Sequence, residues 1–197
     1  MLAAKYDIPS TSTGATLRRE REQKTELGRE AERWTAGGEL APDELILRIV
    51  RKWMDAQADG FLFDGFPRTL GQAQAFEEEL HIRGLTLDGA IHFDVSDSEI
   101  RRRVLDRLTC GQCGATYSAA YHALAPGSAC PACRAPLVRR EDDTEATLAR
   151  RMTEYRSQTL PVVAFYRDRG TLFTLDASAG REKIFSLLCQ YVEGSPT

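Results

Sequence analysis

Four cysteines in the middle of the chain carry the most specific chemical signal. They form two C-x-x-C pairs, CGQC and CPAC, with 16 residues between them: Cys110, Cys113, Cys130 and Cys133. Two such pairs at this separation are typical of one tetrahedral Zn²⁺ site. Four thiolates leave no open position for a substrate. We therefore predict a structural zinc ion that folds a segment too small for a hydrophobic core of its own.

Other interpretations of this cluster remain open. They are an iron site, four cysteines without a metal, and redox-active pairs. A zinc ribbon that binds nucleic acid is a weaker candidate, because the segment has few basic residues and few aromatic residues beyond Tyr117 and Tyr121. The fifth cysteine, Cys189, lies on the apolar face of a predicted helix and is expected in the core.

A second group of candidates directly follows a predicted strand, in the stretch GFLFDGFPRT. The carboxyl ends of strands are where open α/β sheets bind ligands. Asp64 there could hold Mg²⁺ through water, and the planar fork of Arg68 could bind a phosphate. The same residues fit a turn closed by a salt bridge equally well. Gln72 also fits a capping box with Thr69, without any role in binding.

Two further sets of polar residues carry a weaker signal. Thr13 and Arg18 flank a predicted helix start, where free N–H groups favour an anion, although a capping threonine and an exposed arginine explain this pair equally simply. Arginines also cluster around the cysteine segment. Charge runs on helices are usually solvated faces, so this clustering is only suggestive. These arginines are Arg103, Arg107, Arg139, Arg140 and Arg151.

Composition sets the broad class of the protein. The 197 residues are 42% hydrophobic and 28% charged, with a formal net charge of −3, which is typical of one globular domain and gives no general case for nucleic acid or membrane partners. Arginines make up 22 of the 26 basic residues, which permits a phosphate-handling site. Without an apolar run long enough for a bilayer or a signal peptide, the sequence predicts a cytoplasmic protein.

The order of the expected elements predicts the fold class. Short apolar strands at 60–65, 90–95 and 171–176 alternate with helices of ten residues or more, and a shorter strand is expected near Ile8. This alternation is typical of an α/β fold with a parallel sheet flanked by helices. Residues 109–140 interrupt it as an insertion. The expected helices cover 14–35 with a break near Thr25, 43–56, 70–83, 97–108, 142–169 and 181–193.

Taken in order, the motifs resemble the adenylate kinase family, and within it the bacterial form with a long, zinc-binding lid. The resemblance rests on KYDIPSTSTGATLR, GGELAPDELI, GFLFDGFPRT with Gln72, the RRRVLDRLTC-to-CPAC segment, RREDDTEATLARRMTEY and TLFTLDA. It implies the fold of P-loop nucleoside monophosphate kinases and the reaction ATP + AMP = 2 ADP with Mg²⁺. It also implies a five-stranded parallel sheet, an AMP-binding segment at 12–41, a lid at 108–140, and a core of 1–107 and 141–197.

The resemblance also implies roles for individual residues, and a monomer whose partners are nucleotides. Arg68, Arg107, Arg140 and Arg151 would be catalytic. AMP would contact Thr13, Arg18, Glu39, Leu40, Ala41, Gly65, Phe66, Pro67, Arg68, Gln72, Arg140 and Arg151. ATP would contact Arg103, Arg107, Thr116, Tyr117 and Ala179. Asp64 would hold Mg²⁺ through water, and Cys110, Cys113, Cys130 and Cys133 would hold zinc.

One motif of the family is missing from the sequence. The family has a central strand followed by a GxxGxGK loop that wraps phosphates, whereas none of the four lysines here follows a glycine. The resemblance thus predicts a gap between the strands at 60–65 and 90–95, and no ADP formation by these residues alone. Three readings follow: a kinase with a mis-assigned start, an inactive fragment, or an AMP-binding protein without the donor loop. The codons upstream of Met1 would distinguish them.

Overall fold

The computed structural model describes residues 1–35, 41–57 and 60–194, and of 32–35 the backbone only. The chain divides into two compact units, which are described separately. One comprises Met1–Asp94 with Thr153–Thr197, and the other comprises Val95–Met152. Glu39 and Leu40, both expected near AMP, lie outside the described residues.

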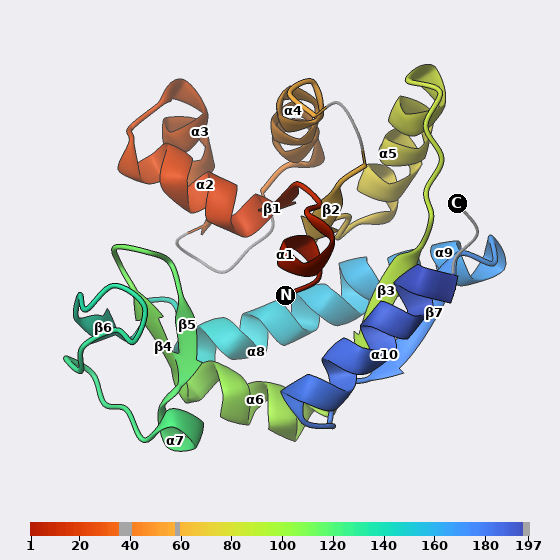
Figure 1. Cartoon of the computed structure of the whole chain (residues 1–197). Coiled ribbons are helices and arrows are strands. Elements are labelled where there is room, and N and C mark those ends of the chain that lie inside the picture. Colours follow the sequence, from red (N-terminus) through yellow and green to blue (C-terminus); the bar gives the residue numbers. More distant parts are fainter. Residues whose placement is uncertain (36–40, 58–59, 195–197) are drawn as a thin grey trace. The chain divides into compact units, whose positions relative to one another are not determined.

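In the larger unit, four short strands form two parallel pairs. Strand β1 (Ser10–Ser12) pairs with β2 (Leu62–Asp64), and β3 (Ala90–Asp94) pairs with β7 (Leu172–Asp176) (Figure 1). Within the described part of the chain β2 and β3 are not paired with each other. The arrangement therefore differs from one five-stranded sheet, because no described strand supplies the backbone hydrogen bonds that would join the two pairs.

The helices of this unit follow the expected pattern closely. The break near Thr25 is confirmed between α2 and α3, where the Thr25 hydroxyl accepts from the Gly28 N–H at 3.0 Å. Helix α4 begins at Asp43, as expected, with Pro42 as its N-cap residue. The helices are α1 (Leu2–Tyr6), α2 (Thr13–Glu22), α3 (Glu26–Thr35), α4 (Asp43–Met54), α5 (Leu70–Ile82), α9 (Leu160–Asp168) and α10 (Arg181–Gly194).

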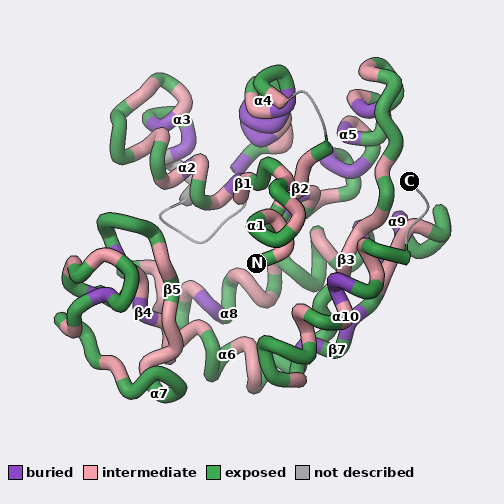
Figure 2. The backbone as a smooth tube through the Cα atoms, in the orientation of Figure 1, coloured by how far each residue is buried: buried purple, intermediate pink, exposed green. Residues whose placement is uncertain are grey.

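Apolar residues at helical spacing bury one face of α4. Leu45, Ile49 and Val50 are at most 5% exposed and belong to the main core, which also takes in Phe76 of α5 (Figure 2). The strand β2 contributes Phe63, whose ring lies 5.1 Å from Trp53 and 5.6 Å from Phe76. Aromatic rings at these distances add to the stabilisation from burial. This core fixes the end of β2, where the GFPRT loop begins.

The smaller unit is built around a three-stranded antiparallel sheet in the order β5-β4-β6. The long helix predicted at 142–169 was placed three residues too early. It begins at Glu145 and is capped by Thr144, whose hydroxyl accepts from the Thr147 N–H at 3.2 Å. The unit contains α6 (Asp97–Leu105), β4 (Arg107–Cys110), β5 (Thr116–Ser118), α7 (Ala119–His122), β6 (Leu137–Val138) and most of α8 (Glu145–Glu154). Helix α8 continues through a π-helical turn, Tyr155–Thr159, into α9.

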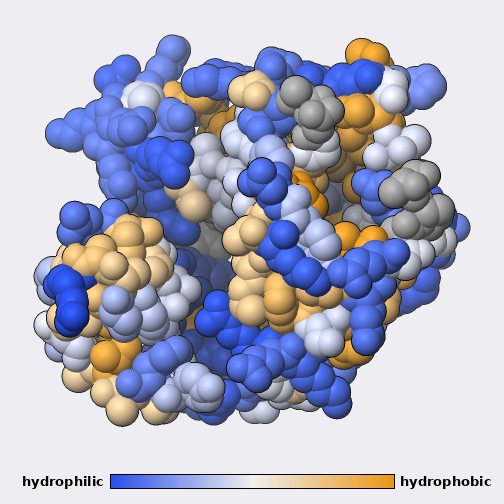
Figure 3. Space-filling model, viewed as in Figure 1, coloured by the Kyte–Doolittle hydropathy of each residue, from blue (hydrophilic) through white to orange (hydrophobic). Residues whose placement is uncertain are grey.

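The residues of α2 are mostly polar. Over α2 the space-filling view shows hydrophilic side chains (Figure 3), in keeping with its sequence TGATLRRERE. None of the helices in the described ranges is both long and apolar enough to cross a bilayer.

Glu79 of α5 joins two helices of the larger unit, and we expect its charge to stabilise the fold in a pH-dependent way. It accepts from Arg51 Nε of α4 at 2.8 Å and from Arg83 Nε at 2.7 Å. Burial raises the pKa of Glu79, but the hydrogen bonds and charges of Arg83 and Arg51 lower it further, so the net shift is downward. A carboxyl shifted this way stabilises the fold above its unfolded pKa and ceases to do so as the pH falls through its folded pKa.

We therefore expect Glu79→Gln to lower the free energy of unfolding by about 1–2 kcal/mol at pH 7. The difference from the wild type should shrink as the pH falls below about 4, in urea titrations at several pH values. Glu78→Gln, at an exposed neighbouring position, is the control. A difference that stays constant from pH 7 to pH 3 would contradict this assignment.

Candidate functional site

The first candidate site lies at the carboxyl ends of β1 and β2. Ser12 and Asp64 are in register at this edge, so the residues that follow them, Thr13 and Gly65, are neighbours. The Thr13 hydroxyl donates to the Gly65 carbonyl at 3.3 Å, and Thr13 is buried at the start of α2. A helix N-terminus beside strand ends is a common place for an anion to bind. Asp64 is exposed at the same edge.

Arg68 is held against the turn that follows β2. Its Nε donates to the Gly65 carbonyl at 2.7 Å, and the Thr159 hydroxyl donates to the Arg68 carbonyl at 2.9 Å. Gly65 has a φ of 71°, and a Cβ there would lie 2.7 Å from Arg68 Nη2. The positive φ therefore favours glycine at this position. The Phe66–Pro67 peptide bond between them is cis.

Gln72 is buried in a hydrogen-bonded network at the start of α5. The predicted cap is present, because the Thr69 hydroxyl accepts from the Gln72 N–H at 3.1 Å. The Gln72 side chain does not return to the Thr69 backbone, as a full capping box would require. Its Oε1 accepts from the Arg68 N–H at 2.8 Å, and its Nε2 donates to Asp43 Oδ1 at 2.8 Å. Arg68 and Gln72 are thus directly connected.

Other residues of this unit that were expected to contact AMP or ATP lie on or next to α2, α4 and α10. Arg18 is half-buried on α2, where its Nη1 would lie 3.5 Å from a Cβ added at Gly14. Ala41 is buried just before α4. Ala179 lies half-buried between β7 and α10.

In the smaller unit, two adjacent carboxylates bring two of the expected arginines together. Arg107 Nε donates to Asp143 Oδ2 at 2.8 Å, and Arg151 Nη1 lies 3.7 Å from Asp143 Oδ1. Arg151 also binds Asp142 through Nη2. The Asp143 side chain is 2% exposed, whereas those of Arg107 and Arg151 are 27% and 35% exposed. The carboxylates therefore fix the guanidinium groups and leave part of each accessible to an anion.

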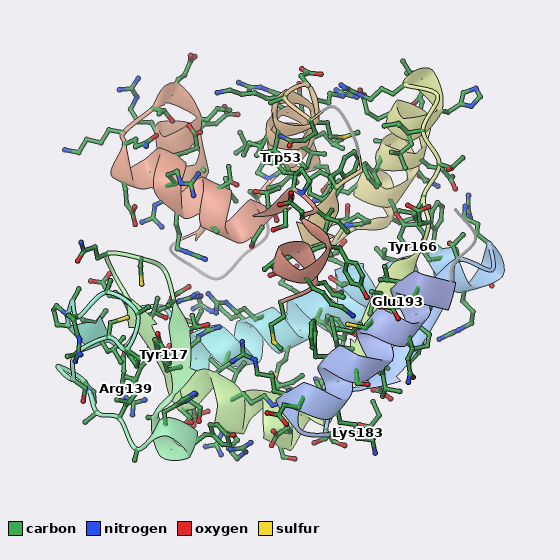
Figure 4. All side chains as sticks on the ribbon, viewed as in Figure 1. Trp53, Tyr117, Arg139, Tyr166, Lys183 and Glu193 are labelled. Carbon is green, nitrogen blue, oxygen red and sulfur yellow. The ribbon has the colours of Figure 1, made fainter. Side chains whose placement is uncertain are left out.

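The remaining arginines expected at the site in the smaller unit have individual partners. Arg140 Nε donates to the Thr109 hydroxyl at 3.1 Å, and Arg103 Nε donates to Glu99 at 2.7 Å. Arg139, labelled in Figure 4, donates to the Leu105 carbonyl. The arginines near Asp142 lower the pKa of its carboxyl. Burial raises this pKa, but the Arg151 hydrogen bond and the charges of Arg151 and Arg140 lower it more. Thr116 is exposed on β5.

The four cysteines form one cluster whose thiol sulfurs all lie within 4.8 Å of one another. Two Sγ–Sγ distances are 3.4 Å (Cys110–Cys133) and 3.7 Å (Cys113–Cys130). A tetrahedral metal with sulfur ligands at about 2.3 Å has ligand separations of about 3.8 Å. The donor set and its spacing therefore fit a four-coordinate metal ion.

Backbone N–H groups surround the buried sulfurs. The Cys113 N–H lowers the pKa of the Cys110 thiol. For Cys130 burial raises the pKa, but the N–H groups of Cys133 and Ala132 and the Tyr117 hydroxyl bring it down to about 6. Tyr117 (Figure 4) lies with its hydroxyl 3.6 Å from Cys130 Sγ, so it packs on the cluster. These contacts favour the thiolate form that binds a metal at Cys110 and Cys130. The Ala135 N–H lowers the pKa of Cys133, but the neighbouring thiols and burial raise it to about 12.

Each C-x-x-C pair closes with the same turn. The Gly114 N–H donates to the Cys110 carbonyl at 3.0 Å, and the Arg134 N–H donates to the Cys130 carbonyl at 2.9 Å. Gly114 and Arg134 both have positive φ, at 72° and 69°. The two halves of the cluster are thus built alike.

Three acidic residues of these networks were not singled out by sequence reasoning. Asp43 was interpreted only as part of a helix start, and nothing in its spacing indicates contact with Gln72. Asp142 and Asp143 were taken as a helix start or as part of a motif. The signal that could have found them is a pair of acids next to arginines, which in a folded chain must be neutralised.

Parallel strands with an arginine and two helix N-termini at their carboxyl ends are typical of α/β proteins that bind phosphate-containing ligands. Comparison with known proteins identifies the family. The family model described as adenylate kinase matches residues 1–171, and the chain belongs to this family.

Curated relatives agree with this assignment. The adenylate kinase of Moorella thermoacetica is 44% identical over 87% of this chain and 80% of its own length. That of Finegoldia magna is 40% identical over 93% and 86%, respectively. That of Clostridium novyi is 36% identical over 98% and 91%.

Proposed function

We propose that this chain acts in the reversible phosphoryl transfer ATP + AMP = 2 ADP, and so in adenine nucleotide homeostasis. Family membership supports this reaction. The proposal rests mainly on one observation. Hydrogen bonds hold Thr13, Gly65 and Arg68 together at the carboxyl ends of β1 and β2, and Gln72 is hydrogen-bonded directly to Arg68. A hydroxyl, a guanidinium and a carboxamide are the groups that a phosphate and an adenine base require.

The proposed AMP site is centred on the carboxyl ends of β1 and β2. Arg68 would bind the phosphate and Gln72 would read the base. Residues 12–41 would form the AMP-binding segment of a core made of 1–107 and 141–197. The proposed AMP contacts are Thr13, Arg18, Glu39, Leu40, Ala41, Gly65, Phe66, Pro67, Arg68, Gln72, Arg140 and Arg151.

The proposed lid comprises residues 108–140, and its flanking arginines would bind the transferring phosphoryl group. Phosphoryl transfer needs two nucleotides held in line, charge neutralised and water excluded, with little covalent help from the protein. Arg107 and Arg151, held by Asp143, would neutralise the phosphate charge, and closure of the lid would exclude water. The proposed ATP contacts are Arg103, Arg107, Thr116, Tyr117 and Ala179.

Two metal ions belong to this proposal. Mg²⁺ bound with ATP would neutralise phosphate charge, and the exposed Asp64 at the end of β2 would hold it through water. Zn²⁺ is proposed for the cysteine cluster, because four sulfur ligands at tetrahedral spacing suit it best. The four thiolates complete its coordination shell, so the metal would stabilise the lid and take no part in the chemistry.

The proposed setting is the cytoplasm, with ATP, AMP and ADP as the only partners and a monomeric chain. The supporting observations are the unpaired thiols and the modest net charge of −3. Thiols remain reduced in that compartment.

AMP binding to the 197-residue chain tests the acceptor site. We expect one AMP per chain with a Kd of about 10⁻⁵ to 10⁻³ M by calorimetry, in the usual range for enzyme substrates. Arg68→Ala should weaken binding by about 10–100-fold, since it removes a charge-assisted phosphate contact. Arg167→Ala, at an exposed position on α9, is the control. Equal AMP affinity in the wild type and in Arg68→Ala would contradict the proposed acceptor site.

ADP formation tests the reaction itself. The sequence has no GxxGxGK loop, so the assay should compare this chain with one carrying an added strand, glycine loop and helix start of about twenty residues. We expect ADP from ATP, AMP and Mg²⁺ with the extended chain. AMP binding without ADP formation in either form would favour the alternative, an AMP-binding protein or inactive fragment that lacks the phosphate-donor loop.

A further inference from the structure

The carboxamide of Gln72 can take only one orientation in its network. The carboxylate of Asp43 only accepts hydrogen bonds, and the backbone N–H of Arg68 only donates. Nε2 must therefore face Asp43 Oδ1 and Oε1 must face the Arg68 N–H, both at 2.8 Å. The reversed carboxamide would place oxygen against carboxylate and N–H against N–H. Since Gln72 is 2% exposed, water cannot relieve either conflict.

Asp43 is itself fixed by a second contact and by close packing. Its Oδ2 accepts from the Thr69 hydroxyl at 2.7 Å, and that hydroxyl caps α5 by accepting from the Gln72 N–H. A Cβ at Gly71 would lie 2.8 Å from Asp43 Oδ2, so the first turn of α5 approaches the carboxylate closely. The start of α4 is thereby docked on the start of α5 through a single side chain.

The locked carboxamide has a directional binding pattern. Nε2 has a second hydrogen and Oε1 a second lone pair, so a base that reaches this buried group would meet a donor and an acceptor. Adenine presents an amino donor next to a ring-nitrogen acceptor and matches this order. A 6-oxopurine such as hypoxanthine presents a carbonyl acceptor next to an N–H donor, which is the reverse order. Its recognition in the same position would need the reversed carboxamide.

From this geometry we infer that Asp43 is a specificity-determining positioning residue, which restricts the acceptor nucleotide to adenine over 6-oxopurines by locking the Gln72 carboxamide. The inference rests on the proposed function, because it assumes that AMP binds where Gln72 lies. Asp43 would act on the base through its hydrogen bond to Gln72.

The test is the ratio of AMP to IMP affinity, measured by calorimetry on the 197-residue chain and on Asp43→Asn. Asparagine can either accept from Gln72 or donate to it, so the reversed carboxamide keeps only its conflict with the Arg68 N–H and becomes more accessible. We expect the wild type to prefer AMP by about 100-fold, and the variant by less than about 10-fold. Glu44→Gln removes the same charge from the same helical turn at an exposed position and should keep the wild-type ratio.

The outcomes separate this inference from the proposed function. If the wild type binds neither nucleotide, the proposed AMP site fails and the inference fails with it. If the wild type prefers AMP and Asp43→Asn weakens both nucleotides by the same factor, Asp43 is only structural and the inference alone is overturned. In a Gln72→Leu background, Asp43→Asn should leave the ratio unchanged, because the two residues act through one contact.

A measurement on the wild type tests the inference even if the variant fails to fold. The side-chain hydrogens of Gln72 should exchange with solvent at least about 10-fold more slowly than those of the exposed Gln23, by nuclear magnetic resonance. Equal exchange rates for the two side chains would show that the carboxamide is not locked, and would overturn the inference.

Discussion

Removal of the zinc proposed for the cysteine cluster is expected to unfold the three-stranded sheet β5-β4-β6. The apolar residues that are fully buried there are few, essentially Leu108 and Leu137 beside Cys110 and Cys130. So small a core cannot hold three short strands together. Metal binding by four thiolates supplies about 10–16 kcal/mol in small zinc domains. Without the metal, that stabilisation is lost and close thiolates repel one another.

Amide hydrogen exchange would report this unfolding directly. The Cys110 N–H donates to the Ala115 carbonyl at 2.9 Å, and the Cys130 N–H donates to the Ala135 carbonyl at 2.7 Å. We expect protection at both amides to fall by on the order of 10³-fold or more in a chelator or in Cys130→Ser. Elemental analysis should find one metal per wild-type chain and none in the variant.

Cys189→Ser is the matched control for this prediction. Cys189 is buried in α10, outside the cluster, and the substitution removes a thiol without removing a ligand. It should leave the metal content unchanged, and also the protection of the Cys110 and Cys130 amides from hydrogen exchange. Retained protection in metal-free Cys130→Ser would show that the sheet is held by packing, and the structural role of the metal would be withdrawn.

The elements with a strong periodic or capping signal could be predicted from the sequence. The cap at Thr69 is confirmed, because a hydroxyl three residues before an amide side chain is a typical helix start. The start at Asp142 was wrong for a tertiary reason. Asp142 and Asp143 are engaged by Arg151 and Arg107, so the next hydroxyl, Thr144, caps the helix instead.

The candidate site was predictable to a lesser extent. The motif GFPRT places Arg68 and Gln72 at a strand end, and this follows from the sequence alone. Their connection through Asp43 depends on α4 docking against α5, a contact between residues 29 positions apart. Local spacing carries no information on such a contact. The gap between β2 and β3, by contrast, was predicted from the resemblance, and the two strands belong to separate pairs.

Replacement of Asp143 by alanine is expected to destabilise the smaller unit by about 3 kcal/mol. Asp143 is buried with a side chain 2% exposed, and it bridges Arg107 and Arg151. Removing one partner of a buried ion pair leaves the other charges without compensation. The two guanidinium groups are partly exposed, so water would recover some of the loss, and the effect should lie at the lower end of the range for buried pairs.

Asp142→Ala is the comparison variant for Asp143→Ala. Asp142 binds Arg151 but not Arg107, and its side chain is 30% exposed, so its removal should cost about 1 kcal/mol or less. Urea unfolding of metal-saturated protein, followed by hydrogen exchange at residues of α8, would measure both variants. Because two arginines depend on Asp143 and one on Asp142, a smaller or equal loss in Asp143→Ala would mean that the bridge does not hold the arginines. Their proposed role as a preset phosphate clamp would then lose its physical basis.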